Sequence, residues 1–476
     1  MKSEMKTSIE MFKKEVQERG GNLHSFILYH RGEVLCEEYY GSNNENKLHR
    51  MFSIAKSITA YAILHLISEE RLTLEDKIIS YFPEFISEKT HEYVKQLTIK
   101  NMLMMRTCYS KTTYKLSRND WVRTFFETEP DHRPGTLFAY DTSSAHVLGA
   151  LVEKLTGRDP LSYIKEKIPA IGLSKDSYML KDPDGISMGG SGYVAYTKDL
   201  QRIACFLLDA FILDDENFSK KYSVSAVYRK LIFDACGGDG QNEGLRSATI
   251  IRAKSAFESH GYAMMTWRCD HNGFMCYGMG GQFAAVYPDK EVILITTADN
   301  QGKPCGNDAV FDSFYKYILP EVEDKKENNE TEAEKEVIPE GKNLVFFLEQ
   351  NEQNFTKLEI KNEGGRRFRL QLLGETNYEL YFRMQSLKDI IYRKEGESES
   401  GIFQYYNQYY DGRGCITDDN TLYLVFDVND AYLGSVHMMV RLSDDKRCAD
   451  IFMKKIEESL FHEFKGFYVG NNGQFL

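Results

Sequence analysis

Hydrophobic and polar positions follow two different periods along the chain, and the change of period divides it into two parts. Up to about residue 320, segments with apolar residues three or four positions apart lie between sets of short alternating runs. These are the periods of helices and of half-buried strands. After about residue 340, short alternating runs rich in aromatic residues follow one another, with turn residues between them. The pattern predicts an α+β domain followed by an all-β domain that closes towards a barrel or a sandwich.

The two ends of the first part are predicted to meet in one sheet. The stretch "HSFILYHRGEVLCEEYYG" is typical of two strands around a turn at Arg31-Gly32. The stretch "GQFAAVYPDKEVILITTAD" is typical of two strands joined by Pro288-Asp289-Lys290, and a last helix is expected over roughly residues 307–319. Because helical segments lie between the two strand pairs, a common sheet flanked by helices is expected.

The first residues predict an amphipathic helix with Ile9, Phe12 and Val16 on one side. This stretch contains no unbroken apolar run of the kind found in a signal peptide. No later run approaches the length of a transmembrane helix. With Met1 as the true start, a cytoplasmic protein without membrane contacts is expected.

An acidic segment separates the two parts. Residues 321–340 hold nine acidic and three basic side chains, a net charge of −6 in a chain whose net charge is −12. With so few apolar residues the segment cannot bury enough surface to pack, so an exposed linker is expected. The predicted domains are therefore residues 1–320 and residues 341–476.

The second domain contains eight short runs with the alternation typical of strands. They are "NLVFFLEQ", "FTKLEIKN", "RRFRLQLLG", "YELYFRMQ", "DIIYRK", "GIFQYYNQYY", "TLYLVFDV" and "VHMMVRLS". A short capping helix is expected near residues 450–464, "DIFMKKIEESLFHEF". No residue pattern here points to chemistry. Covering a cleft of the first domain, binding a ligand and joining copies into a homo-oligomer are three roles that the sequence leaves open.

Composition narrows the possible partners and cofactors. The chain is 42% hydrophobic and 27% charged, which is typical of a globular protein. Its net charge of −12 favours neither nucleic acid nor an anionic membrane as a partner. The nine cysteines include no Cys-x-x-Cys pair and the eleven histidines no His-Glu-x-x-His. Free thiols and a protein without a metal or other cofactor are therefore expected.

Ser53 and Lys56 form the most informative candidate for chemistry. A serine hydroxyl is a weak nucleophile unless a neighbouring group takes its proton. Positions i and i+3 share one face of a helix, so Lys56 can reach the Ser53 hydroxyl. The same face continues with Ala60, Ile63 and Ile67, which draws Lys56 towards the core, where desolvation lowers the pKa of an amine. Ser53 would lie at the helix N-terminus, where free backbone N–H groups favour negative charge.

The Ser-x-x-Lys spacing by itself is a weak signal. It occurs five times, beginning at Ser3, Ser53, Ser162, Ser313 and Ser443. A helix cap followed by a surface lysine explains the other four. Only the occurrence at Ser53 opens a strongly apolar helix.

The segment "FSIAKSITAYAILHLISEERLTLEDKIISYFPEF" resembles the active-site helix of serine β-lactamases and penicillin-binding-protein relatives. The resemblance is closest to the class C-like branch, which includes esterases and 6-aminohexanoate-oligomer hydrolases. Four more segments match in order: "LTIKNMLMMRTCYS", "PGTLFAYDTSSAHVLGALVEKLTG", "GGSGYVAYTKDLQRIACFLL" and "YGMGGQFAAVYPDKEVILITTAD". The matches cover most of residues 22–320, and five collinear segments are more specific than any one motif. The resemblance implies an antiparallel sheet flanked by helices, with a helical subdomain.

The resemblance also implies catalytic roles for four residues. Ser53 would be the nucleophile that accepts the acyl group, and Lys56 its base or the group that holds the base deprotonated. The phenol of Tyr140 would pass a proton between Ser53 and the leaving group. The backbone N–H groups of Ser53 and Gln282 would form the oxyanion hole, where fixed donors stabilise the tetrahedral intermediate.

The substrate side departs from the family pattern at two positions. Thr142 stands where the second motif commonly ends in asparagine, and Met279 where the third motif commonly begins with lysine or histidine. In the family that lysine meets the carboxylate of a β-lactam or a peptide C-terminus, so Met279 favours a neutral or apolar substrate. Gly280 and Gly281 permit close approach of the substrate. Trp121 would border the cleft as a pocket wall, although a core tryptophan explains it nearly as well.

The leading interpretation is a cytoplasmic serine hydrolase that acts on small esters or amides through an acyl-enzyme. Two alternatives stay open. One is an enzyme that recognises β-lactams or peptides, as a β-lactamase or a carboxypeptidase does. The other is a binding or scaffold protein that retains the fold without turnover, a reading that the altered third motif supports.

Overall fold

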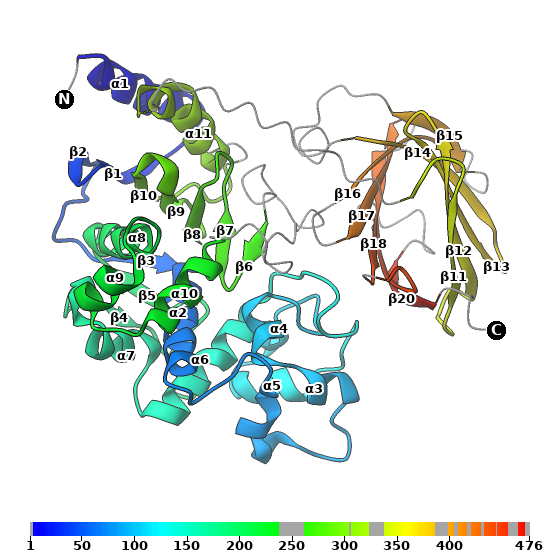
Figure 1. The fold of residues 1–476 in the computed structure, drawn as a ribbon, viewed down its shortest axis with the longest axis horizontal. Helices are drawn as coiled ribbons and strands as arrows, with labels where there is room; N and C mark the ends of the chain where they lie inside the picture. The colour runs from blue at the N-terminus through cyan, green and yellow to red at the C-terminus, as the bar shows by residue number, and fades with distance from the viewer. Residues whose placement is uncertain are drawn as a thin grey trace. The chain divides into compact units, whose positions relative to one another are not determined.

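The computed structural model describes residues 3–237, 261–303, 306–322, 338–385, 398–403, 408–416, 420–429, 433–443, 445–455 and 465–471. The chain forms two compact units (Figure 1). The first contains the described residues up to Pro130 and those from Phe138 to Val322. The second contains Asp131–Leu137 together with the described residues from Ile338 onwards.

The helices and strands are as follows in chain order. The helices are α1 (Ser3–Glu18), α2 (Ile54–Ser68), α3 (Glu92–Gln96), α4 (Ile99–Leu103), α5 (Trp121–Glu127), α6 (Thr142–Thr156), α7 (Pro160–Lys167), α8 (Thr197–Ile212), α9 (Asp215–Tyr222), α10 (Ala226–Ala235), α11 (Gly306–Ser313) and α12 (Leu319–Val322). The strands of the first unit are β1 (Leu23–His30), β2 (Glu33–Tyr39), β3 (His49–Phe52), β4 (Tyr178–Met179), β5 (Tyr193–Ala195), β6 (Tyr262–Ala263), β7 (Thr266–Arg268), β8 (Phe274–Gly278), β9 (Gln282–Tyr287) and β10 (Val292–Ala298). Those of the second are β11 (Asn343–Leu348), β12 (Phe355–Gly364), β13 (Arg367–Gly374), β14 (Tyr378–Met384), β15 (Glu399–Phe403), β16 (Gln408–Ile416), β17 (Thr421–Asn429), β18 (Leu433–Leu442), β19 (Cys448–Lys455) and β20 (Gly466–Asn471).

A seven-stranded antiparallel sheet forms the centre of the first unit, in the order β2-β1-β10-β9-β8-β7-β6. Strand β1 pairs with β10, with Leu23 opposite Ala298 and His30 opposite Val292. The first and last strand pairs of this part of the sequence therefore share one sheet, as predicted. The predicted turns are confirmed as well: Arg31 and Gly32 take left-handed backbone angles (φ 47° and 87°) between β1 and β2.

Helices cover both faces of this sheet. On one face, Phe12 of α1 packs on Phe26 with ring centroids 4.9 Å apart, which confirms the predicted apolar side of α1. On the other face, Phe211 of α8 packs on Phe274 of β8 at 5.2 Å. The predicted last helix is longer than expected: α11 continues through a π-helical turn at Phe314–Ile318 into α12.

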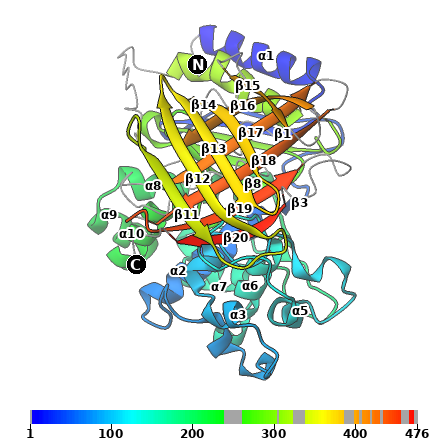
Figure 2. The same cartoon turned by 90° about the vertical axis from the view of Figure 1, so that its right-hand side faces the viewer.

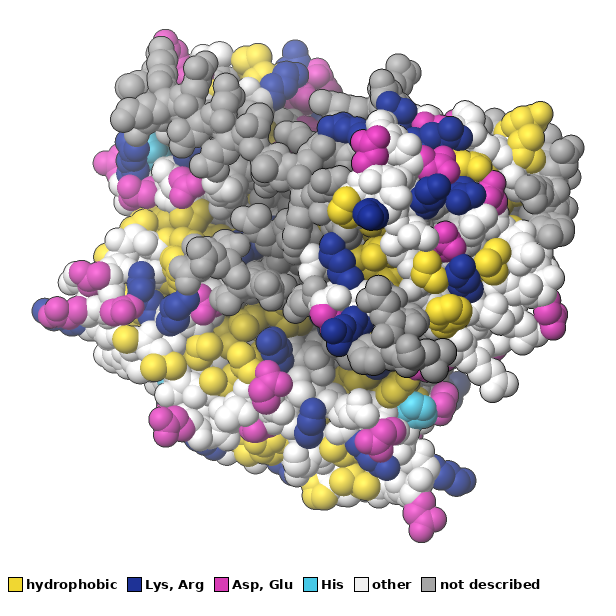
Figure 3. All heavy atoms as spheres, turned by 45° about the vertical axis from the view of Figure 1, so that its right-hand side comes forward, with side chains coloured by type: hydrophobic (Ala, Val, Ile, Leu, Met, Phe, Trp, Pro, Cys, Tyr) yellow, Lys and Arg dark blue, Asp and Glu magenta, His cyan; other side chains and the backbone are white. Residues whose placement is uncertain are grey.

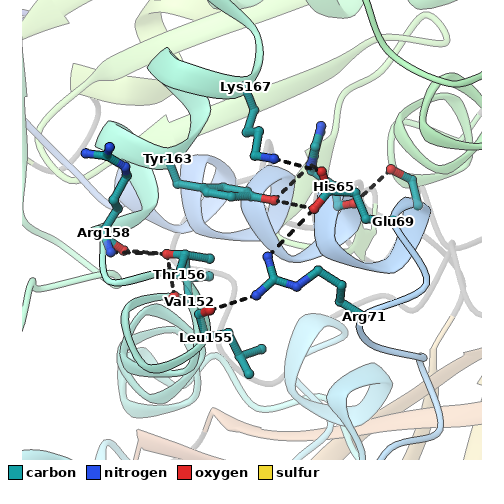
Figure 4. A network of polar contacts seen from close by, with 10 residues as sticks. His65, Glu69, Arg71, Val152, Leu155, Thr156, Arg158, Tyr163 and Lys167 are labelled. Carbon is teal, nitrogen blue, oxygen red and sulfur yellow. Dashed lines mark hydrogen bonds and ion pairs between the residues drawn. The ribbon is translucent and has the colours of Figure 1, made fainter.

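Helix α2 lies in the interior, and every residue from Ile54 to Leu66 is buried. Its C-terminal end is held by polar contacts with α7 (Figure 4). The hydroxyl of Tyr163 lies 3.0 Å from Nδ1 of His65 and donates to Glu69 at 3.1 Å, while Lys167 donates to the same carboxylate at 2.9 Å. These contacts fix the end of α2 opposite to Ser53, and thereby the direction of the helix.

The second unit is a barrel. Its ten described strands form one sheet in the order β14-β13-β12-β11-β20-β19-β18-β17-β16-β15, and β14 also pairs with β16 in parallel, which closes a ring of nine strands. Figure 2 shows the strands of the two halves crossing at an angle. Alternate residues point inwards: Phe368, Leu370 and Leu372 of β13 are 8%, 0% and 0% exposed. The predicted all-β domain that closes towards a barrel is confirmed.

The prediction of a helix near residues 450–464 is wrong for the described residues of that range, because Cys448–Lys455 form strand β19 between β18 and β20. The strand expected at residues 389–394 lies outside the described residues, as does most of the linker at residues 321–340. The run at residues 401–410 contributes to two strands, β15 and β16.

The described surface carries charges of both signs. On the face drawn in Figure 3, acidic and basic side chains are interspersed with apolar ones. Within the described part of the chain, no helix is both long and apolar enough to cross a membrane. Eight of the nine cysteines lie in described segments, and each of those eight is a free thiol.

Candidate active site

Ser53 lies at a sharp turn between strand β3 and helix α2. Phe52, the last residue of β3, has a left-handed backbone (φ 47°). Ser53 then takes helical angles (φ −70°, ψ −5°) as the N-cap of α2. A left-handed aromatic residue costs on the order of 1–3 kcal/mol and persists only where the surroundings enforce it. The turn leaves the Ser53 hydroxyl at the positive end of an apolar helix.

Lys56 lies one helical turn further on, and its amine has three oxygen neighbours. Its Nζ is 3.1 Å from Oγ of Ser53 and 3.3 Å from Oγ1 of Thr142, and it donates to the carbonyl of Gly190 at 2.6 Å. The lysine is 1% exposed. The predicted meeting of Ser53 and Lys56 is therefore present, and Thr142 contributes a second hydroxyl.

Burial lowers the pKa of Lys56 from the usual 10.5 to about 7. The carboxyl group of Asp141 opposes this shift but does not cancel it. Asp141 is itself buried, and burial raises its pKa against the hydrogen bonds from Ser143 and Ser144. A neutral amine has a free lone pair, so at and above neutral pH Lys56 can accept the proton of Ser53.

The lowered pKa of Lys56 should appear in the stability of the protein. Between pH 7 and 10.5 the unfolded chain binds more protons at Lys56 than the folded chain does. The free energy of unfolding therefore rises with pH in this range. Between pH 7 and 9, Lys56 should add roughly 2 kcal/mol to the free energy of unfolding. Lys56→Met should lack this increment in urea titrations at the two pH values.

The control for that comparison is Lys14→Met, since Lys14 is 75% exposed on α1. Other titrating groups cancel when each variant is compared with the wild type at both pH values. Equal increments in the wild type and in Lys56→Met would show that the lysine is charged in the folded protein at pH 7.

Tyr140 lies beside Lys56 in an aromatic surround. The Nζ of Lys56 is 4.8 Å from the centroid of the Tyr140 ring. Trp267 and Tyr262 pack on the same ring at 5.5 Å and 5.8 Å. The next residue, Asp141, caps helix α6 by accepting from the backbone N–H groups of Ser143 and Ser144, at 2.9 and 3.1 Å. Tyr140 thus contacts two aromatic rings and directly precedes the cap of α6.

Gly190 offers its carbonyl group to Lys56 from a position that has no room for a side chain. A Cβ atom on Gly190 would lie 2.6 Å from Cγ2 and 2.7 Å from the carbonyl oxygen of Thr142. The neighbouring carbonyl of Gly189 accepts from Thr59 of α2 at 2.9 Å. The glycine pair therefore packs closely between α2 and α6, and the Gly190 carbonyl is the closest of the three oxygen neighbours of the lysine amine.

The third motif lies at the turn between β8 and β9. Gly280 and Gly281 have φ values of 90° and 100°, which only glycine adopts readily. The side chain of Gln282 holds the turn, since its amide donates to the carbonyls of Met279 (3.0 Å) and Ala298 (2.7 Å). At the start of the turn, a Cβ on Gly278 would lie 2.1 Å from the carbonyl oxygen of Met51, two residues before Ser53. The turn therefore lies next to the strand that leads to Ser53.

Two predicted substrate residues differ in their surroundings. Met279 is 46% exposed at the tip of the turn, so its side chain is open to contact. Trp121 stacks flat on Tyr114 with ring centroids 4.2 Å apart, and both rings meet the edge of His146. Trp121 of α5 thus packs in an aromatic cluster with Tyr114 of a short 3-10 helix (Thr113–Leu116) and His146 of α6.

Sequence reasoning missed several residues that surround the predicted site. They are Tyr114, Gly190, Tyr262 and Trp267. Gly190 lies within the glycine-rich segment that resembles the family. Close packing of the backbone at this segment could therefore have been predicted from the sequence. The aromatic residues have no distinctive spacing, and only the folded chain brings Tyr262 and Trp267 to Tyr140 and Tyr114 to Trp121.

The profile of a family described as β-lactamase matches residues 10–309. "Protein flp" of Staphylococcus aureus (strain COL) is 27% identical over 156 residues, which is 29% of this chain and 31% of that protein. The match thus spans well under two thirds of that relative's length.

Solved structures share the fold at low sequence identity. One is a candidate 6-aminohexanoate-dimer hydrolase from Bacillus anthracis, with a TM-score of 0.52, 18% identity and coverage of 65% of this chain and 81% of that one. Another is SurE with D-Leu, with a TM-score of 0.52, 14% identity and coverage of 99% of both chains. At these identities the matches show similarity of fold alone. Because the family profile spans more than half of the sequence, and includes the helix of Ser53 and the turn at Met279, the chain belongs to the β-lactamase family.

Proposed function

We propose that the protein is a serine hydrolase that forms an acyl-enzyme on Ser53 and acts on small neutral esters or amides. The observation that carries the proposal is the position of Lys56, whose amine lies 3.1 Å from Ser53 Oγ and is 1% exposed. A buried lysine without a full counter-charge has little value for stability. Its pKa of about 7 suits proton transfer at neutral pH.

The proposed acylation step uses four groups. Lys56 takes the proton of the Ser53 hydroxyl as Oγ attacks the substrate carbonyl carbon. The resulting oxyanion is stabilised by the backbone N–H groups of Ser53 and Gln282, a contribution of about 3 kcal/mol for each such donor. Tyr140 hands a proton to the leaving alcohol or amine as the C–O or C–N bond breaks. Water then attacks the acyl-enzyme by the same proton route in reverse.

The substrate preference rests on Met279. An exposed thioether offers an apolar contact and no charge to pair with a substrate carboxylate. Thr142 supplies a hydroxyl beside Lys56 where the family commonly has an amide. Both positions suit an uncharged acyl group better than the carboxylate of a β-lactam or a peptide C-terminus.

The test compares p-nitrophenyl butyrate, a neutral ester, with nitrocefin, a β-lactam that carries a carboxylate. We expect kcat/KM for the ester to exceed that for nitrocefin on the order of 100-fold, since the carboxylate loses solvation without gaining a partner. Met279→Lys should raise kcat/KM for nitrocefin up to about fivefold, the value of one partly exposed ion pair.

Met279→Leu is the matched control, because it keeps an apolar side chain of similar volume. It should leave both rates near those of the wild type. Comparable rates on ester and nitrocefin in the wild type would contradict the neutral-substrate preference and favour a β-lactam-recognising enzyme. An absence of turnover on both would favour a binding or scaffold protein.

A further inference from the structure

The segment Asp131–Leu137, called the tether below, belongs by its contacts to the second unit, although its neighbours in sequence belong to the first. It leaves the first unit after Pro130 and returns to it at Phe138. Gly135 (φ 80°) forms its turn, and the Thr136 hydroxyl donates to the carbonyl of Arg133 at 2.6 Å. The barrel therefore carries seven residues that do not come from its own part of the sequence.

Charged groups of the barrel hold the polar part of the tether. Arg133 forms an ion pair with Asp450 of β19 at 2.5 Å, and the Asp450 side chain is only 11% exposed. Arg441 of β18 donates from one guanidinium nitrogen to the carbonyls of Gly135 (2.9 Å) and Thr136 (2.8 Å). Hydrogen bonds from a charged donor to backbone carbonyls are among the stronger ones in proteins.

The end of the tether is held by apolar contacts. Leu137 is 3% exposed and belongs to a cluster on the barrel with Tyr423, Val425 and Met439. This cluster is separate from the one that fills the barrel interior. The tether is thus anchored at three successive points: an ion pair, a guanidinium clamp and a buried leucine.

Only two residues separate this anchor from the predicted catalytic tyrosine. Three peptide steps span at most about 11 Å, so Tyr140 follows Leu137 with little slack. Along this link Phe138 packs on Tyr262 at 5.2 Å, the ring that also contacts Tyr140, and Ala139 donates to the carbonyl of Met105 at 2.9 Å.

We propose that the C-terminal barrel positions Tyr140 by clamping the tether, with Arg441 and Arg133 as positioning residues. This inference rests on the proposed function, because it assigns the barrel a part in the proton transfer by Tyr140. Proton transfer depends steeply on distance and angle, and a displacement of about 1 Å can cost 100-fold in rate. A chain anchored close to Tyr140 narrows the range of its positions.

The sharpest test adds slack without removing any contact of the clamp. Two glycines inserted between Leu137 and Phe138 should lower kcat on p-nitrophenyl butyrate about tenfold or more, with KM little changed. The matched control inserts two glycines between Pro130 and Asp131, on the side of the tether that leads to α5, and should keep kcat within about twofold. Rates are expressed per active site titrated with a fluorophosphonate, so loss of folded protein does not count as loss of rate.

A second variant tests the positioning role without the insertion, in case the insertion prevents folding. Arg441→Ala should lower kcat per titrated site, and Arg441→Lys should restore part of it. Arg447→Ala is the control, because Arg447 pairs with Asp445 and both side chains are exposed. The pH profile of kcat should change in Arg441→Ala and not in Arg447→Ala, a readout that a merely structural role would leave unmoved.

The outcomes separate the two proposals. An active wild type whose Leu137 insertion and Arg441→Ala variants keep kcat per titrated site overturns the positioning role alone. Equal losses for the two insertions overturn it as well. A wild type that neither reacts with the probe nor hydrolyses the ester overturns the proposed function, and this inference with it.

Discussion

Ser53→Ala is expected to abolish the formation of an acyl-enzyme. The wild type treated with a fluorophosphonate should gain a single adduct on Ser53 in intact mass spectrometry, and the variant none. On p-nitrophenyl butyrate kcat should fall on the order of 10⁴-fold or more, the scale seen when a catalytic serine is removed. The reason is that the Ser53 hydroxyl is the proposed nucleophile and lies 3.1 Å from the amine of Lys56, the proposed base.

The sequence itself offers a matched control for this variant. Ser162 begins another Ser-x-x-Lys pattern, but there the serine hydroxyl donates to Asp159 and the lysine, Lys165, donates to the carbonyl of Ser177 at 2.6 Å. Ser162→Ala should therefore keep the adduct and the rate. Labelling that persists in Ser53→Ala would show that the reactive nucleophile is another residue.

The second large effect concerns Lys56 and pH. Only the neutral amine can accept the Ser53 proton, so kcat/KM of the wild type should be lost as the pH falls through about 7 and level off above it. Below that value the rate should drop about tenfold for each pH unit. Lys56→Met should lower kcat/KM about 10³-fold and should lack this limb of the profile. Initial rates between pH 5 and 9, corrected for spontaneous ester hydrolysis, would show both effects.

Two variants check the assignment of that limb. Lys165→Met removes the lysine of the Ser162 pattern and should keep both the rate and the profile. Tyr140→Phe should reduce the rate but keep a limb near pH 7, because Lys56 remains. A limb that survives in Lys56→Met would assign the titration to another group, and the proposed base would then be wrong.

Local spacing explains why part of this site could be predicted from the sequence. Ser53 and Lys56 are three positions apart on one helix, so their side chains lie on one face whatever the helix packs against. The apolar residues that follow bury that face, and the lowered pKa of Lys56 is a direct consequence. The amphipathic first helix and the turn at Arg31-Gly32 are readable for the same reason: their signals lie within a few residues.

The barrel shows where such signals fail. Cys448–Lys455 lead into a run rich in lysine and glutamate, which by propensity favours a helix. Pairing with β18 and β20 and the burial of Ile451 and Met453 make Cys448–Lys455 a strand instead. Strand formation depends on partners and on the face that is buried, so the residue types alone do not decide it.

The chain's local patterns were sufficient for the helix that begins after Ser53, the α+β class and an all-β second domain, because each depends on periods and turns of neighbouring residues. Contacts between distant residues required the folded structure. The carbonyl that Lys56 binds belongs to Gly190, 134 positions away. Likewise, nothing in Asp131–Leu137 marks it as part of the barrel, since its anchors Arg441 and Asp450 lie more than 300 positions further on. Close packing brings such residues together, and that packing is a property of the whole fold and of no single segment.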